Sequence, residues 1–533
     1  MTDRPNPTMP KTSHRFRLLS VIALLCGLTM APTYAEDSLL RRGLGPEPDS
    51  LDIHQAQGLA ALQVLRDLHE GLVTFDAAGE LTGGAAEDWT VDESGARYRF
   101  TLRPDLKWSN GDPLVSGDFV RGWQTAVDPS SQARTASLLA PVSGAREIIA
   151  GRRDPASLGI RALDDRTLEI DLEQATPWFL ELLAHPVAYP LHPTGAEEVL
   201  ERPVSGAYRL LEAVPRSHLA LERNPAWHGA DSVALDRIDY LPIEDPGAEL
   251  SRFRAGELHI TETIPPGRHD WLAENLSEAL RIAPYMGSFW LGLNLSRPPL
   301  NDAPDLRRAL SLAIDRETLT RVVMGAGEVP AWTIVPPGLP GYRPPRDPAE
   351  ALTQDEREDR ARALYARAGY GAERPLRLQL RFNTSAQHRR MAVAVAAMWK
   401  QVLGVSTELL HEEWKVFVNN RRQGLLTQAF RGGWIADYAD PVSFLDLFRS
   451  GDPLNNTFYS DVDYDALLDT AAGHGGGQRL ELLQQAETRL LRDTPVIPLY
   501  YYVSRHLVDP RVRGYVDNPR DVHLSRYLDL GEP

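Results

Sequence analysis

The sequence contains one cysteine, Cys26, among 533 residues. It lies in an N-terminal apolar segment, residues 18–30, which follows several basic residues and ends shortly before Ala35. This order of a basic start, an apolar core and small residues is typical of a secretory signal peptide, so we expect residues 1–35 to be removed. The mature chain would then hold no cysteine, which excludes both disulfides and thiolate chemistry.

Long apolar segments are also missing. After the expected signal peptide, no stretch reaches the roughly 18 uninterrupted apolar residues that a membrane-spanning helix needs. Leu25 precedes Cys26 where a lipoprotein signal would have a small residue, so we expect no lipid anchor. The mature chain is therefore expected to be exported to the periplasm as a soluble protein.

Positive charge is scarce relative to negative charge. The formal net charge is −16, which repels phosphate backbones and anionic lipid and argues against a nucleic-acid partner. Aromatic residues, in contrast, are plentiful, with 11 tryptophans and 17 tyrosines. They are suited to contact surfaces for a ligand, although the core of a large protein also uses them.

Motifs for catalysis, metals and cofactors are absent from the sequence. His411-Glu412 begins like the zinc-protease helix motif, but the second histidine position is Lys415. Residues 461–465 resemble the start of a calcium loop, yet its sixth position is Ala466 and its twelfth is Ala472, so we expect these acids to begin a helix instead. No nucleophile elbow, phosphate-binding loop or dinucleotide fingerprint occurs. We therefore predict a protein that is not an enzyme and needs no metal or cofactor.

The order of predicted elements indicates an α/β protein of several domains. Residues 376–430 read as strand, helix, strand, helix, strand, with Gly404 and Gly424 ending the helices and the last strand at 425–430. Another strand is predicted at 289–294. We expect domain I to comprise 36–79, 190–283 and 505–533, domain II to comprise 80–189, and domain III to comprise 284–504. The chain would cross between two lobes more than once, as a hinge requires.

The stretch from Arg431 to Pro441 is the candidate ligand site. It follows the predicted strand at 425–430, and ligands of α/β units lie beyond the carboxyl ends of strands. Gly432 and Gly433 have no side chains, so another backbone can approach closely. Trp434 offers a flat apolar face and Asp437 a carboxylate, a combination suited to an extended peptide with its ammonium end. The alternative is that Asp437 caps a helix and Trp434 belongs to the core.

Several ordered motifs resemble those of the oligopeptide-binding proteins of ABC importers, the solute-binding family 5. They are Ser50-Leu51-Asp52, Arg66-Asp67-Leu68-His69-Glu70-Gly71-Leu72, Phe100-Thr101-Leu102-Arg103, Lys107-Trp108-Ser109-Asn110-Gly111, Gly206-Ala207-Tyr208, Leu221-Glu222-Arg223-Asn224-Pro225, Ala313-Ile314-Asp315-Arg316, Asn383-Thr384-Ser385, Gly433-Trp434-Ile435-Ala436-Asp437-Tyr438 and Tyr500-Tyr501-Tyr502. The resemblance covers almost all of the mature chain. It implies a periplasmic-binding-protein fold of two lobes and three domains that closes over a short peptide, and delivery of that peptide to inner-membrane permease subunits by a monomeric protein.

The resemblance also implies roles for individual residues. Asp437 matches the acid that pairs with the peptide ammonium, and Gly433 and Ile435 match backbone partners of the peptide. Trp414 and Trp434 match positions that shape side-chain pockets. Arg421, Arg431 and His388 match positions that receive the peptide carboxyl end, and Tyr285 and Tyr502 match positions that line the cleft.

Two departures from the family pattern leave the ligand open. A cysteine pair frequent in the family is replaced by Gly287 and Ile435, and Glu262 introduces an acid where the pattern is richer in amides. A receptor for murein peptide, or for a non-peptide ligand such as a metal chelate or glycoside, therefore remains an alternative. An exported peptidase is a third hypothesis, which the missing motifs disfavour.

Overall fold

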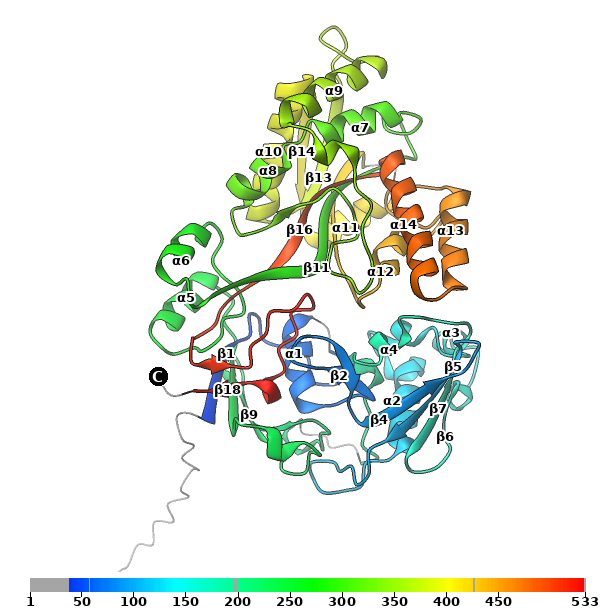
Figure 1. Ribbon diagram of the computed structural model, residues 1–533, viewed down its shortest axis with the longest axis vertical. Coiled ribbons are helices and arrows are strands. Elements are labelled where there is room, and N and C mark those ends of the chain that lie inside the picture. The colour runs from blue at the N-terminus through cyan, green and yellow to red at the C-terminus, as the bar shows by residue number, and fades with distance from the viewer. Residues whose placement is uncertain (1–37, 57, 195–198, 425–426, 532–533) are drawn as a thin grey trace, which may run out of the picture.

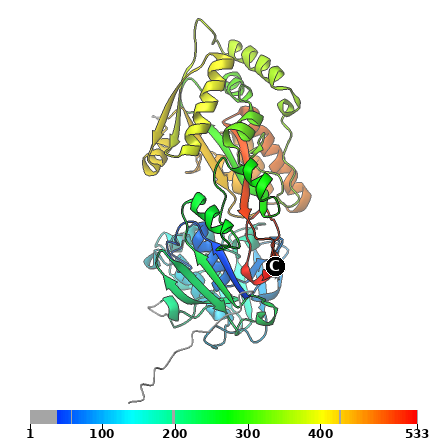
Figure 2. The same ribbon diagram turned by 90° about the vertical axis from the view of Figure 1, so that its left-hand side faces the viewer.

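The computed structural model describes residues 38–56, 58–194, 199–424 and 427–531. The predicted signal peptide, residues 1–35, lies outside them. The described chain forms two lobes, one above the other in Figures 1 and 2. Lobe 1 carries both chain ends of the described part, and lobe 2 is built from the middle of the sequence. The two-lobed α/β fold expected from the sequence is confirmed.

Lobe 1 contains a four-stranded sheet in the order β1-β10-β9-β8. Its strands are β1 (Leu39–Gly43), β8 (Tyr208–Val214), β9 (His218–Arg223) and β10 (Arg237–Leu241). The first strand pairs in parallel with β10, almost 200 residues later in the chain. Helix α1 (Leu59–Leu68) packs beside β8 through Val64 and Leu68, which share a core with the sheet. The helices α5 (Pro246–Arg254) and α6 (His269–Asn275) follow β10.

A second four-stranded sheet of lobe 1, in the order β4-β5-β7-β6, has its own core. Its strands are β4 (Ala86–Val91), β5 (Arg97–Leu102), β6 (Ile160–Ala162) and β7 (Thr167–Asp171). A short hairpin precedes it, made of β2 (Val73–Phe75) and β3 (Leu81–Gly83). The accompanying helices are α2 (Ser116–Val127), α3 (Ala145–Ile149) and α4 (Phe179–Leu182).

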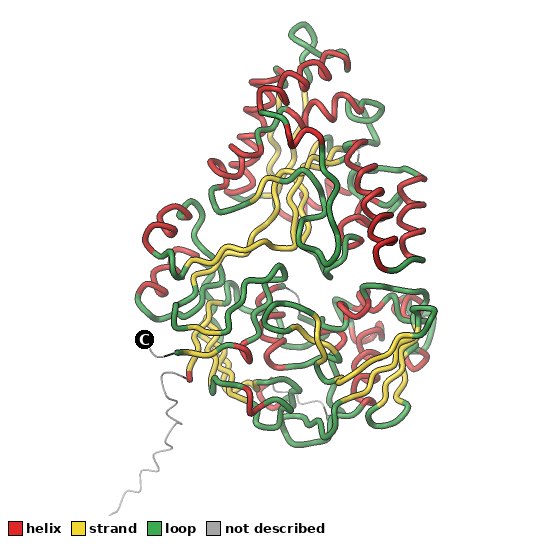
Figure 3. The backbone as a smooth tube through the Cα atoms, viewed as in Figure 1, coloured by secondary structure: helices red, strands yellow, loops and turns green. Residues whose placement is uncertain are grey.

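Lobe 2 is organised around a six-stranded sheet in the order β12-β16-β11-β15-β13-β14 (Figure 3). Its strands are β11 (Leu280–Leu293), β12 (Val329–Pro330), β13 (Arg377–Asn383), β14 (Ser406–Glu412), β15 (Ala429–Ile435) and β16 (Val496–Leu507). Its helices are α7 (Pro304–Leu312), α8 (Arg316–Thr318), α9 (Gln354–Arg367), α10 (Ala386–Leu403), α11 (Trp414–Arg422), α12 (Val442–Leu445), α13 (Val462–Ala472) and α14 (Gly476–Asp493).

Local signals in lobe 2 act as expected from the sequence. Gly404 ends α10 in a left-handed conformation with φ 71°, which glycine adopts without strain. The side chain of Asp461 accepts hydrogen bonds from the amides of Asp463 and Tyr464 and so caps the start of α13. The acids that resembled a calcium loop therefore begin a helix.

Two long antiparallel strands, β11 and β16, connect the lobes. Their ladder runs from Leu280, opposite Leu507, to Pro284, opposite Val503, and resumes at Ser288. At the break, the Met286 amide donates a 2.8 Å hydrogen bond to the carbonyl of Pro519, which belongs to the C-terminal segment. Pro519 lies between the two short strands of that segment, β17 (Val512–Arg513) and β18 (Asp529–Leu530). Both strands therefore run from one lobe to the other, and the regular pairing between them is interrupted where they cross.

Two predicted strand boundaries were wrong. The strand predicted at 289–294 is observed as β11, which begins at Leu280. Pairing with β16 extends the strand through Pro284, although proline has no amide hydrogen to donate to a neighbouring strand. The strand predicted at 425–430 is observed as β15 from Ala429 to Ile435, while residues 425 and 426 lie outside the described part. Glycine disfavours strands locally, but here pairing with β11 decides the conformation.

Candidate ligand-binding cleft

A cavity of about 490 Å³ lies between the lobes. Its wall on lobe 2 includes Tyr285 of β11, Ile435 at the end of β15, and Asp437. Its wall on lobe 1 includes residues of α1, residues 260–262, residues 520–524 and several residues between 134 and 185. Segments from distant parts of the sequence therefore meet here, and three of the ten predicted site residues line this cavity directly.

Asp437 lies two residues after β15. Its backbone amide donates to the Oγ of Ser443 at 3.2 Å, and the indole Nε1 of Trp434 donates to the same oxygen at 3.3 Å. Helix α12 begins beside Asp440, whose carboxylate accepts the Val442 amide at 2.9 Å. The alternative that Asp437 caps a helix is therefore wrong.

The carboxylate of Asp437 has no hydrogen-bond or ion-pair partner among the described residues. Burial raises its pKa, and in the described part of the chain no cationic group opposes that effect. A desolvated carboxylate without a counter-ion is a favourable place for a cationic group of a ligand. Trp434, in contrast, is partly buried and packs against the core next to α12.

The backbone of β15 is paired along one edge and largely open along the other. On the paired edge, residues 429–435 lie opposite residues 287–293 of β11, and the Ala436 amide donates to the Met286 carbonyl at 2.8 Å. On the other edge, β13 pairs only with Ala429 and Phe430. Because alternate residues of a strand face the same edge, Gly433 and Ile435 direct their backbone groups to the open edge.

Neighbouring rings occupy the space that a side chain at either glycine of β15 would need. A Cβ atom at Gly432 would lie 2.3 Å from Nε1 of Trp290. A Cβ atom at Gly433 would lie 2.7 Å from the hydroxyl of Tyr502, and a Cβ atom at Gly287 would lie 2.5 Å from Cδ2 of the same ring. Tyr502 therefore packs close to both glycines.

Four further predicted residues gather near the other end of β15. The guanidinium of Arg431 lies 5.1 Å from the ring centre of Trp414, and its Nε donates to Asn383 Oδ1 at 2.7 Å. Arg421 lies over the ring of Phe417 at 5.3 Å. His388 is 5.5 Å from the ring of Phe289. All four come from elements around the open edge of β15.

This second group is cationic and lacks an acid. Neither Arg421 nor Arg431 forms an ion pair with a described carboxylate. Burial, followed by the charge of Arg431, lowers the pKa of Arg421 to about 10 and that of His388 to about 4. Burial also lowers the pKa of Arg431 itself. A bound carboxylate would relieve this unfavourable electrostatic situation.

Several cavity residues were not among the site residues predicted from the sequence, which had noted Glu262 only as a departure from the family pattern. Arg66 of α1 lines the cavity without a described partner, and its Nε is buried and unbonded. Burial raises the pKa of Glu262 to about 8. His506, Asp521 and His523 form a close cluster. Burial alone would lower the pKa of His506, but the Asp521 carboxylate raises it to about 9.

The positions that replace the family's cysteine pair are neighbours in the structure. Gly287 of β11 lies opposite Ile435 of β15 in the antiparallel register. The His411-Glu412 pair, excluded above as a zinc motif, ends β14, and the Glu412 carboxylate pairs with Arg381. Among the described residues, no helix has the combined length and hydropathy that a membrane crossing requires.

Comparison with known proteins identifies the family. The model of the bacterial extracellular solute-binding proteins, family 5, matches residues 80–456. The periplasmic oligopeptide-binding protein OppA of Escherichia coli is 35% identical over 95% of each chain. The unliganded open form of the murein tripeptide-binding protein MppA has a TM-score of 0.84 at 34% identity and covers 93% of this chain and 98% of its own. Haemophilus influenzae OppA in complex with RPPGFSPFR has a TM-score of 0.76 at 30% identity, covering 94% of this chain and 100% of its own. This chain belongs to the bacterial extracellular solute-binding proteins, family 5.

Proposed function

We propose that the protein captures short peptides between its lobes in the periplasm and delivers them to an ABC importer. The observation that carries this proposal is the unpartnered Asp437 carboxylate, which lines the interlobe cavity beside an open strand edge. The carboxylate binds the peptide ammonium group. The peptide backbone adds to the open edge of β15 through Gly433 and Ile435.

The remaining predicted residues act on the rest of the peptide. Arg421, Arg431 and His388 receive carboxyl ends of peptides of different lengths, which is supported by the positive charges of the two arginines, neither of which is paired with a described carboxylate. Trp414 and Trp434 shape side-chain pockets. The exposed fraction of Trp414 is 49%, so its ring is available to a ligand. Tyr285 and Tyr502 line the cleft.

The organisation around the cleft completes the proposal. The signal peptide 1–35 exports a monomer without catalytic activity, and permease subunits in the inner membrane receive the peptide. Domain I comprises 36–79, 190–283 and 505–533, domain II comprises 80–189, and domain III comprises 284–504. The division of lobe 1 is supported by its two four-stranded sheets, because β1, β8, β9 and β10 lie wholly within domain I and β4 to β7 wholly within domain II.

The Asp437→Asn variant tests the role of the carboxylate. Losing a charge-assisted bond of roughly 1.5–3 kcal/mol should weaken peptide binding by about ten- to a hundredfold. Isothermal titration with a tripeptide and its N-acetylated form measures this effect. The wild type should discriminate strongly against the acetylated form, and the variant should not.

Asp88→Asn, on an exposed position of β4, serves as the control and should bind like the wild type. Unchanged affinity of Asp437→Asn for the free tripeptide would contradict the proposal.

Murein peptide is the second candidate ligand. It is favoured by the TM-score of 0.84 with the murein tripeptide-binding protein. Native mass spectrometry of protein purified without denaturation separates the candidates by the mass of the co-purified ligand. Several ligand masses that correspond to ordinary peptides would support general peptide capture. A single ligand mass that corresponds to a peptide with diaminopimelate would support murein peptide.

A further inference from the structure

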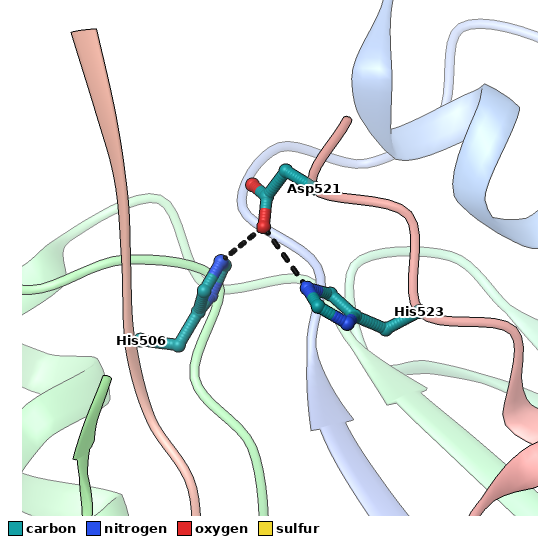
Figure 4. Close-up of side chains that lie close together, drawn as sticks. All are labelled: His506, Asp521 and His523. Carbon is teal, nitrogen blue, oxygen red and sulfur yellow. Dashed lines mark hydrogen bonds and ion pairs between the residues drawn. The ribbon is translucent and has the colours of Figure 1, made fainter. Parts of the chain in front are cut away.

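Three side chains with metal-binding atoms meet on the lobe 1 side of the cavity. His506 belongs to β16, while Asp521 and His523 belong to the loop between β17 and β18 (Figure 4). Nε2 of His506 lies 2.8 Å from Oδ1 of Asp521, and Nε2 of His523 lies 3.1 Å from the same oxygen. The three candidate ligand atoms all lie within 4.8 Å of one another, and all three residues line the cavity.

Surrounding contacts fix the direction of these groups. Nδ1 of His506 is bonded to the backbone carbonyl of Thr261 at 2.9 Å, which directs Nε2 towards Asp521. Such a bond to a carbonyl is the usual outer partner of a histidine that binds a metal. The His523 ring stacks on Tyr515 with centroids 4.0 Å apart and an interplanar angle of 18°. Asp521 adopts φ 54°, a conformation that non-glycine residues adopt rarely.

The set of donor atoms is specific in its chemistry. Two imidazole nitrogens and one carboxylate oxygen suit Zn²⁺ and neighbouring divalent transition metals, whereas Ca²⁺ and Mg²⁺ prefer oxygen alone. Three protein ligands beside a cavity leave a coordination position for an exogenous group.

Arg42 and Glu262 lie near the cluster. Arg42 donates to the His523 carbonyl at 2.8 Å and also contacts Ser525 and Tyr240, while Glu262 lines the same cavity.

We propose that His506, Asp521 and His523 form a binding site for a divalent transition metal of the Zn²⁺ class, open to the interlobe cavity. A metal held there presents its free coordination position to an amino, imidazole or carboxylate group of a molecule in the cavity. The proposal concerns a part of the cavity wall separate from Asp437, so it does not depend on the identity of the transported ligand.

Isothermal titration with Zn²⁺ alone tests the site. The mature protein, without an affinity tag, is treated with a chelator and dialysed into metal-free buffer. We expect one equivalent of Zn²⁺ to bind with a Kd below about 10 μM. Co²⁺ in place of Zn²⁺ should give the visible absorption bands of a low-coordinate site with nitrogen and oxygen ligands.

Two variants distinguish a metal site from a purely hydrogen-bonded triad. Asp521→Asn keeps a hydrogen-bonding group between the histidines but removes the anionic ligand, and His523→Ala removes one nitrogen. Each should weaken Zn²⁺ binding by more than about 100-fold. The loss of a residue that only hydrogen-bonds to a metal ligand already lowers metal affinity by about 10- to 100-fold, and these variants lose a ligand itself.

His411→Ala, on the exposed end of β14 in lobe 2, is the matched control and should leave Zn²⁺ binding unchanged. Thermal unfolding confirms that each variant folds. The proposal is overturned if the wild type binds no Zn²⁺ in this range, or if folded Asp521→Asn binds it as the wild type does.

Discussion

Asp437 and Glu487 are both carboxyl groups whose pKa is raised by burial, but their surroundings differ. Asp437 faces the cavity, and its carboxylate has no partner in the part of the chain that the structure describes. Glu487 of α14 is fully buried and accepts hydrogen bonds from the Ile334 and Val335 amides at 2.8 Å and from the Tyr342 hydroxyl at 2.7 Å. The first group is arranged for a ligand, while the second connects a loop to a helix.

The buried carboxyl group of Glu487 should make the stability of the protein depend on pH. Burial raises its pKa to about 7, against an ordinary value of 4.5. Between these values the folded protein holds the proton and the unfolded chain has lost it. The free energy of unfolding should therefore fall as pH rises from about 4.5 to 7, by at most about 1.4 kcal/mol per pH unit from this group, and should flatten above.

Glu487→Gln stays neutral at every pH and should lose this slope. Relative to the wild type, the variant should gain stability on the order of 1–3 kcal/mol between pH 5 and pH 7.5. Urea unfolding across this range measures the difference. Glu481→Gln, on the exposed face of the same helix, should show no such gain. Parallel stability curves for wild type and Glu487→Gln would count against the assignment.

At the scale of secondary-structure elements, successive amides of β15 point alternately to its two edges, and this alternation determines which amides a peptide can reach. Trp434 and Ala436 direct their amides towards β11, whereas Gly433 and Ile435 face the open edge. Without ligand, the amides of Gly433 and Ile435 should therefore exchange their hydrogens with solvent much faster than that of Trp434.

Adding a saturating peptide should protect Gly433 and Ile435 by at least about tenfold and leave Trp434 nearly unchanged. Hydrogen exchange resolved to single amides by mass spectrometry measures this alternation. Equal protection of all three amides before and after peptide addition would show that the peptide backbone does not add to this strand.

The elements differ in how far the sequence predicted them. Gly404 and Asp461 encode a helix end and a helix start within one turn, so both were predicted correctly. The position of β15 depends on pairing with β11, more than 130 residues earlier in the chain, and both of its predicted bounds were wrong. Local propensity cannot report such pairing.

The candidate site shows the same limit. Asp437 could be found because a glycine-tryptophan motif accompanies it in the sequence. His506 and the Asp521–His523 pair are separated by a turn-rich segment and become neighbours only because the C-terminal segment folds back against β11 and β16. Nothing in their local pattern marks a common site.

At the scale of the whole molecule, the lobes meet on two sides of the cavity. On one side, β11 and β16 cross between them. On the other, α4 and α12 face each other (Figure 1). There, the ring of Trp178, next to α4, stacks on Tyr438 with centroids 5.5 Å apart and an interplanar angle of 8°. Arg479, which pairs with Asp440, lies 5.4 Å from the Trp178 ring. This stack joins lobe 1 to lobe 2 opposite the connecting strands.

Trp178→Ala should therefore speed ligand release. An aromatic pair contributes about 0.5–1.5 kcal/mol beyond its buried area, so losing it should raise the dissociation rate by about two- to tenfold. Stopped-flow displacement of a labelled peptide measures this rate. Trp271→Ala, in α6 of lobe 1, removes a ring that packs away from the stack and is the control. If Trp178→Ala releases peptide at the wild-type rate, the stack does not contribute to retaining the ligand, and Trp178 and Tyr438 only fill space between the lobes.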